Sequence, residues 1–90
     1  PEFFLLDGLT KPVSEGAVWD FLRQFGLALG EADIRVDFFR TGPSIGQGRV
    51  QMRAGPGIQL ADRVMLYRQV AANLARSRGL SATFLPHPIA

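Results

Sequence analysis

The fold is decided by two alternating runs and the turn between them, IRVDFFR at residues 34–40 and RVQMRA at residues 49–54. In both runs apolar residues alternate with charged or polar ones, which is typical of a β-strand with one buried face. The segment 41–48 is rich in Gly, Pro and Ser. We interpret it as a turn rather than a phosphate-binding loop, because it leads into a strand and contains no lysine. Residues 34–54 are therefore predicted to form an antiparallel hairpin.

A helix is predicted on each side of this hairpin. The first is expected from Glu15 to about Leu29, with Ser14 as N-cap and Gly30 as a left-handed stop. The second is expected from about Gln59 to Ser77 and ends at Gly79. Its apolar stripe comprises Leu60, Ala61, Val64, Tyr67, Ala71, Leu74 and Ala75. Trp19, Tyr67 and Met65 are expected in or near the core.

Two outer strands complete the order, Glu2–Asp7 and 80–85. The sequence of elements is then strand, helix, strand, strand, helix, strand. This order predicts an α+β fold, a βαββαβ two-layer sandwich whose four-stranded antiparallel sheet carries both helices on one face. We expect residues 1–90 to form a single domain.

Alternation assigns each strand residue to one of the two sheet faces. The face toward the helices is predicted to hold Phe3, Leu5, Ile34, Val36, Phe38, Val50, Met52, Leu80, Ala82 and Phe84. The opposite face, called the open face from here on, is predicted to hold Glu2, Phe4, Leu6, Arg35, Asp37, Phe39, Arg49, Gln51, Arg53, Ser81, Thr83 and Leu85. An open face that mixes charged and apolar side chains indicates a binding site, an interface or both.

Composition narrows the classes of protein. The 90 residues are 47% hydrophobic and 20% charged, which argues against disorder. No apolar run approaches the ~20 residues that span a bilayer. The chain contains 0 Cys, which excludes disulfides and thiolate metal sites and fits a cytoplasmic location. A net charge of +2 does not by itself call for nucleic acid.

Several motifs resemble those of one enzyme family. EFFLLD at residues 2–7 resembles the E-F-F-L-F-D strand of glutamine synthetase-type ligases, and GLSATFLPHP at residues 79–88 resembles the G-L-x-A-T-F-M-P-K-P of that family. Gly42-Pro43 and Gly46-Gln47 resemble a split form of its G-P-G-Q turn. Leu60-Ala61-Asp62 lies where the family has its A-L-x-A-A-D helix.

This resemblance implies an enzyme that joins glutamate to ammonia or an amine through a γ-glutamyl phosphate. It also implies ATP and two divalent metals, held by carboxylates on the open face. By the same resemblance, Glu2 occupies a metal-ligand position. The glutamates that flank the turn correspond to Arg40 and Arg49, and the lysine of the closing motif corresponds to His87, otherwise an exposed tail residue.

Each arginine at a glutamate position places a positive charge where a cation ligand is implied. We therefore expect a truncated glutamine synthetase-like domain without ligase activity by itself, acting as a binding or assembly module and needing no cofactor. If Glu2 and Arg49 share the open face, their charged atoms should lie within about 4 Å of each other. The binding or interface candidates are Arg35, Phe39, Gln47, Arg49 and Arg53.

Two alternatives stay open. One is a portion of an ATP-dependent glutamate–ammonia or glutamate–amine ligase, completed by other segments or chains and using Mg²⁺ or Mn²⁺. The other is an open-sheet module for RNA or an anion, although nucleic acid is disfavoured because acidic residues dilute the basic ones. We expect no membrane partner. A homo-oligomer, at least a dimer, is predicted from the open-face residues Phe4, Leu6, Phe39 and Leu85.

Overall fold

The computed structural model describes residues 2–8, 11–54 and 60–84. Two helices and five strands lie in this part of the chain. In chain order they are β1 (Glu2–Asp7), β2 (Lys11–Pro12), α1 (Glu15–Glu31), β3 (Ile34–Thr41), β4 (Gln47–Ala54), α2 (Leu60–Ser77) and β5 (Ser81–Thr83). The two-residue strand β2 is an addition to the predicted order.

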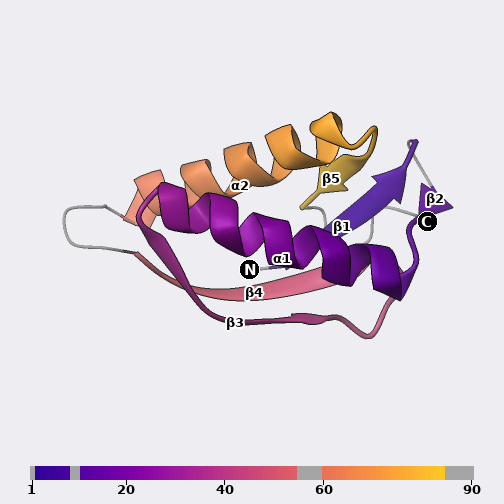
Figure 1. The fold of residues 1–90 in the computed structure, drawn as a ribbon, viewed down its shortest axis with the longest axis horizontal. Coiled ribbons are helices and arrows are strands. Elements are labelled where there is room, and N and C mark those ends of the chain that lie inside the picture. The colour runs from indigo at the N-terminus through magenta and orange to yellow at the C-terminus, as the bar shows by residue number, and fades with distance from the viewer. Residues whose placement is uncertain (1, 9–10, 55–59, 85–90) are drawn as a thin grey trace.

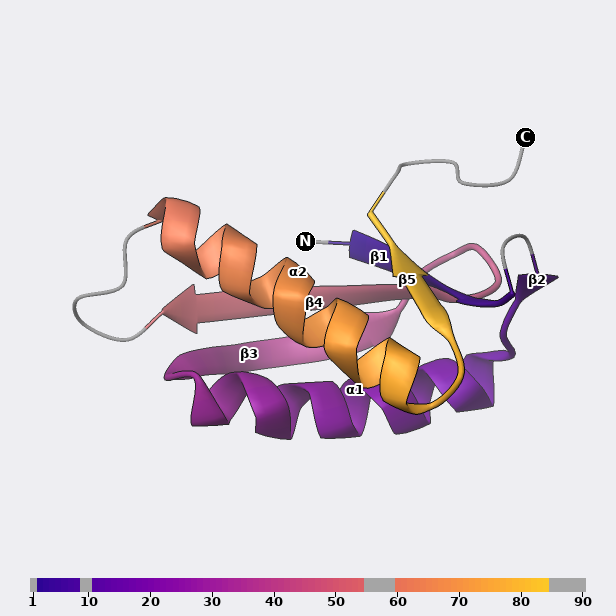
Figure 2. The same ribbon diagram turned by 90° about the horizontal axis from the view of Figure 1, so that it is seen from above.

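Strand β1 is the centre of the sheet. It pairs antiparallel with β4, with β5 and with the short β2, and β4 pairs antiparallel with β3. Figure 1 shows α1 and α2 together on one side of the β3–β4 hairpin, and Figure 2 shows α2 crossing over β4 on that same side. The predicted α+β sandwich, with an antiparallel sheet and both helices on one face, is confirmed.

The core lies between the helices and the sheet and is built around three phenylalanines. The ring of Phe3 lies 5.4 Å from that of Phe21 and 5.7 Å from that of Phe25, and all three side chains are fully buried. Phe3 packs directly over Gly48 on β4, because a Cβ at Gly48 would lie 2.5 Å from the Cζ of Phe3. This close approach joins β1 to β4 at the point where the candidate site begins.

The helix ends match the sequence-based prediction at Ser14 and Gly79 and differ from it at Gly30. Ser14 caps α1 by accepting a hydrogen bond from the backbone N–H of Ala17. Gly79, at φ 71°, follows α2 in the left-handed region as predicted. Gly30 does not stop α1, because the helix continues to Glu31 and the left-handed residue is Asp33, at φ 62°. Aspartate is one of the few residues that adopt this conformation readily, so a glycine was not required.

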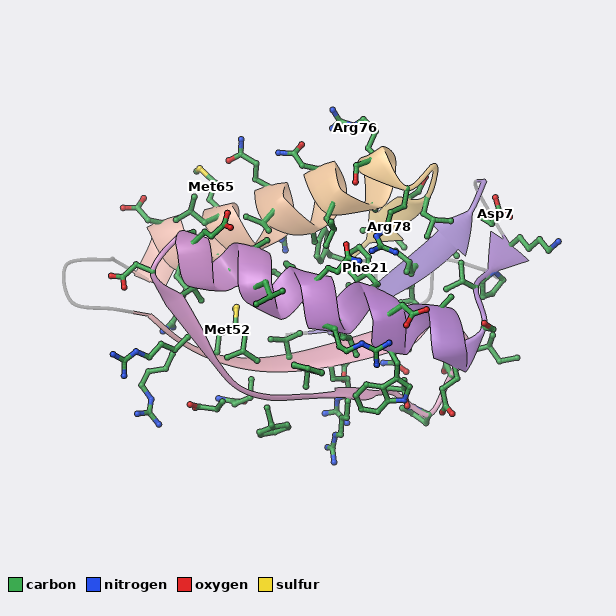
Figure 3. All side chains as sticks on the ribbon, viewed as in Figure 1. Asp7, Phe21, Met52, Met65, Arg76 and Arg78 are labelled. Atoms are coloured by element: carbon green, nitrogen blue, oxygen red, sulfur yellow. The ribbon has the colours of Figure 1, made fainter. Side chains whose placement is uncertain are left out.

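The predicted apolar stripe of α2 is buried at three positions, from Tyr67 onward. Tyr67, Ala71 and Ala75 are buried, whereas Ala61 is exposed and Val64 is 41% exposed. Met65 is also exposed, and Figure 3 shows it on the outer side of α2, while Met52 lies on the helix-facing side of β4. Strand β5 packs against α2, where the ring of Phe84 lies 5.6 Å from that of Tyr67. Neither helix in the described residues is long and apolar enough to cross a membrane.

A β-bulge in β3 corrects the predicted assignment of two phenylalanines. The pairing of β3 with β4 shifts register between Val36 and Phe38, so Asp37 is an extra residue. Beyond the bulge the faces exchange. Phe38 lies on the open face and is 51% exposed, while Phe39 turns toward α1 and packs 6.0 Å from Trp19. The predictions that Phe38 is in the core and that Phe39 is on the open face are therefore wrong.

The predicted apolar surface for self-association is also different in the structure. Phe4 is 8% exposed and Leu6 is 4% exposed, although both alternate with the core residues Phe3 and Leu5 along β1. Strand β1 is central and its side chains are covered on both faces over this stretch. Leu85 lies outside the described residues, and Phe39 faces the helices. The residues expected to drive dimer formation are thus not exposed together.

Candidate functional site

The open face carries a row of three charged side chains on three neighbouring strands. Glu2 on β1 is the register partner of Arg49 on β4, and Arg49 is the register partner of Arg40 on β3. The Nε of Arg49 lies 3.1 Å from Oε1 of Glu2. The predicted ion pair between these two residues is confirmed. We call Glu2, Arg49 and Arg40 the charged row.

Gln47 positions the carboxylate of Glu2 through a hydrogen bond to its second oxygen, Oε2. The side-chain amide nitrogen of Gln47 donates to Oε2 of Glu2 at 3.2 Å, and its Oε1 accepts from the backbone N–H of Ser44 at 3.2 Å. Gln47 is 6% exposed and is the buried polar residue of the described chain. Both oxygens of Glu2 are therefore engaged, one by a guanidinium and one by a buried amide. Gln47 was predicted as a binding candidate, and the structure gives it this positioning contact.

The segment before Gln47 is a turn, as the sequence predicts. The N–H of Gly42 donates to the carbonyl of Gln47 at 2.8 Å, and the N–H of Gln47 donates to the carbonyl of Ser44 at 3.2 Å. Because the Ser44 N–H binds the Gln47 side chain, these three amides bond within the hairpin. The turn thus holds the Gln47 side chain against the charged row.

A hollow of about 180 Å³ opens beside the charged row. It is lined by Glu2, Phe38, Arg40, Arg49, Val50 and Gln51. Two of these side chains are guanidinium groups and one is a carboxylate, so the positive charge is in excess. Arg40 lies with its guanidinium carbon 5.8 Å from the centre of the Phe38 ring. Among the described residues, the Arg40 guanidinium has no ion-pair or hydrogen-bond partner.

Other predicted candidates lie apart from this hollow. Arg35 and Arg53 are register partners further along the hairpin, and Arg53 pairs with Asp37 at 3.3 Å. Phe39 faces the helices, as described above, so its prediction as an open-face binding residue is wrong. His87 lies outside the described residues.

Sequence reasoning missed Phe38 as a lining residue. Alternation places one member of the Phe38-Phe39 doublet on each face, but it does not reveal the bulge that decides which of them is on the open face. A second hollow, of about 240 Å³, reaches the other side of Glu2 and is lined also by Met52, Val64, Tyr67, Arg68 and Phe84. The hydroxyl of Tyr67 is buried and has no hydrogen-bond partner among the described residues. Burial, and then the nearby Glu2 carboxylate, raise the pKa of Tyr67, so this phenol stays neutral.

Together, the sheet and its charged row define an open-faced α+β domain that presents polar chemistry on the side away from its helices. The family model described as "Glutamine synthetase, catalytic domain" matches residues 2–90. The chain therefore belongs to the glutamine synthetase family, as the sequence motifs led us to expect.

Individual relatives agree with the family model. The chain is 31% identical over 104 aligned positions to the glutamine synthetase of Mycolicibacterium smegmatis, covering 99% of this chain and 23% of that protein. It is 28% identical over 103 positions to the glutamine synthetase of Methanocaldococcus jannaschii, covering 98% and 23%. A 44-residue stretch is 43% identical to the glutamine synthetase of Frankia alni, covering 49% of this chain and 9% of that protein. The chain thus spans less than a quarter of the length of these relatives.

Proposed function

We propose that this part of the glutamine synthetase catalytic domain has lost the metal site that the family resemblance implies on the open face. In this proposal it has no ligase activity by itself and serves as a binding or assembly module. The observation that carries the proposal is the charged row, in which Arg49 pairs with Glu2 while Arg40 lies beside them.

The donor set of the row does not fit a divalent cation. Mg²⁺ and Mn²⁺ bind oxygen ligands, and a guanidinium has only N–H donors and stays protonated in proteins. Glu2 brings the carboxylate to this hollow, and both its oxygens already accept from Arg49 and Gln47. At an effective dielectric constant of 20, each positive charge at 4 Å repels another by about 4 kcal/mol per unit charge. A dication would meet this repulsion from two arginines.

The ligase alternative places stricter demands on the rest of the protein. A working centre at this face would need other segments or chains to bring carboxylates to the row and to displace Arg49 from Glu2. For the nucleic-acid alternative, Phe39 faces the helices and is not available to stack on a base at the open face, and Arg53 is paired with Asp37. The unpartnered Arg40 favours the anion-binding form of that second alternative, which is developed below.

Self-association and a cytoplasmic location remain parts of the proposal. The absence of cysteine from the sequence supports a reducing compartment. The family resemblance supports assembly, but the surface involved must differ from the one predicted, because Phe4 and Leu6 are buried. Light scattering at micromolar concentration tests this part, and a monomer would contradict it.

Thermal unfolding with Mn²⁺, with ATP and with both tests the proposal as a whole. We expect Mn²⁺ to change the midpoint by no more than about 1 °C, both without ATP and in its presence. A ligand at about 100 times its Kd would add roughly 2.7 kcal/mol, which corresponds to ten degrees or more for a domain of this size. A metal-dependent rise of that order would restore the ligase reading and contradict the proposal.

A further inference from the structure

We propose that the hollow beside the charged row binds a small oxyanion, a phosphate or carboxylate group, between Arg40 and Arg49. This inference rests on the proposed function, because a hollow that held a divalent cation would not also receive an anion between two arginines.

The strand register places two arginines opposite each other, and only one of them has an acidic partner among the described residues. Arg40 and Arg49 are directly opposite each other on antiparallel strands, an arrangement in which like charges repel. Glu2 neutralises Arg49 through the contact between Oε1 and Nε. No such partner compensates Arg40 among the described residues. The charged row therefore has one net positive charge.

Glu2 is held so that it does not turn to Arg40 instead. Its Oε2 accepts from Gln47, whose amide is oriented in turn by the backbone N–H of Ser44. Gln47 is buried, so the middle of this hydrogen-bond chain is protected, while the Glu2 side chain at its end is 50% exposed. The carboxylate consequently stays at the β1–β4 side of the hollow, and the β3 side is left to Arg40.

The side chains that line the hollow are suited to binding one end of a small molecule. The contact to Glu2 uses Nε of Arg49, which leaves its two Nη groups available to a second acceptor. Arg40 contributes a second fork of donors, and paired guanidinium groups bind phosphate or carboxylate oxygens with short, charge-assisted hydrogen bonds. The exposed ring of Phe38 and the amide of Gln51 line the hollow beside them. A volume of about 180 Å³ is small for a drug-sized ligand and fits an oxyanion with a short organic stem.

Titration of the chain with inorganic phosphate and with succinate, at constant ionic strength set with chloride, tests this inference. The readout is the Nε–Hε signals of Arg40 and Arg49 in nitrogen-15 correlation spectra. We expect saturable shifts at both residues with at least one probe, at millimolar concentration. Saturation by phosphate alone identifies a phosphate site, and saturation by succinate alone identifies a carboxylate site.

Variants separate a specific site from general attraction to a basic surface. Arg40→Gln should weaken binding at least about tenfold, whereas Arg40→Lys, which keeps the charge, should lose less. Arg35→Gln removes the same charge from the same strand outside this hollow and should change the Kd less than about twofold.

An equal loss in Arg35→Gln, or the lack of any saturable shift with either probe, would overturn the inference. A parallel titration with Mn²⁺ distinguishes the two failures. Binding of Mn²⁺ at the charged row would reject the proposed function together with the anion site. No response to Mn²⁺, phosphate or succinate would reject the anion site and leave the proposed function standing.

Discussion

The Nε of Arg49 lies 3.1 Å from Oε1 of Glu2, across the register pair that joins β4 to β1. The side chains are 40% and 50% exposed, respectively. Ion pairs with this exposure contribute little to stability, because water screens the attraction and two long side chains must be ordered. The main consequence of the contact is therefore local: it places a guanidinium against the carboxylate at the position where the family resemblance implies a metal ligand.

A double-mutant cycle measures how much the pair stabilises the fold. For Glu2→Gln, Arg49→Gln and the double variant, we expect a coupling free energy of about 0.2–1 kcal/mol from urea unfolding, decreasing with added salt. A coupling above about 3 kcal/mol that salt does not change would contradict the partly exposed geometry.

Truncation of the two neighbouring phenylalanines of β3 should lower the stability of the fold by very different amounts. Phe39→Ala should destabilise the fold by about 2 kcal/mol or more, because it removes the contact with Trp19 and leaves a gap beneath α1. Phe38→Ala should change the free energy of unfolding by about 0.5 kcal/mol or less, because the ring is 51% exposed. The reverse order would mean that strand alternation continues through Asp37 without a bulge.

This pair of residues marks the limit of prediction from the sequence. The hairpin, both helices and the antiparallel order followed from hydrophobic periodicity, which is set by burial along each element. The contact between Glu2 and Arg49 was also predictable, because alternation and motif position put both on the open face. A bulge leaves periodicity intact on each side and changes only its phase, so the exchange of Phe38 and Phe39 was not predicted. The burial of Gln47 depends on its contacts with Glu2 and Ser44, which sequence pattern does not encode.

Two glycines near helix ends should differ in their tolerance of alanine. Gly30 is helical and a Cβ there meets nothing within 4 Å, so Gly30→Ala should stabilise the fold by about 0.5–1 kcal/mol. Gly79 has φ 71°, so Gly79→Ala should destabilise it by about 1 kcal/mol. Chemical denaturation of both variants checks this, and destabilisation by Gly30→Ala would indicate that α1 ends at about Leu29 with Gly30 in the left-handed region, as the sequence alone predicted.

Tyr67 should make stability fall at high pH. Its pKa is raised above the ordinary value of about 10, first by burial and then by Glu2, so the native state keeps the phenol proton while the unfolded state releases it. The stability that the neutral Tyr67 phenol provides is fully present below pH 10. Above pH 10 it is lost, at up to about 1.4 kcal/mol per pH unit. Urea unfolding between pH 9 and pH 11.5 measures the slope.

Tyr67→Phe is the matched control for this slope. In this variant the free energy of unfolding should fall less steeply above pH 10. At pH 7 its stability should stay within about 1 kcal/mol of the wild type, because the hydroxyl has no partner to lose among the described residues. Since the chain has 1 Tyr, absorbance at 295 nm follows this phenol alone. Ionisation near pH 10 in the folded chain would contradict the buried, neutral phenol.

The proposed loss of metal binding at the charged row is tested most directly by Mn²⁺ binding, followed by electron paramagnetic resonance. The wild-type chain should leave the signal of free Mn²⁺ unchanged at millimolar concentration. The double variant Arg40→Glu/Arg49→Glu should bind Mn²⁺, because it places three carboxylates on register partners of β1, β4 and β3. Arg76→Glu/Arg78→Glu changes the net charge equally at the end of α2 and should not bind. Binding by the wild type as tight as that of Arg40→Glu/Arg49→Glu would contradict the account.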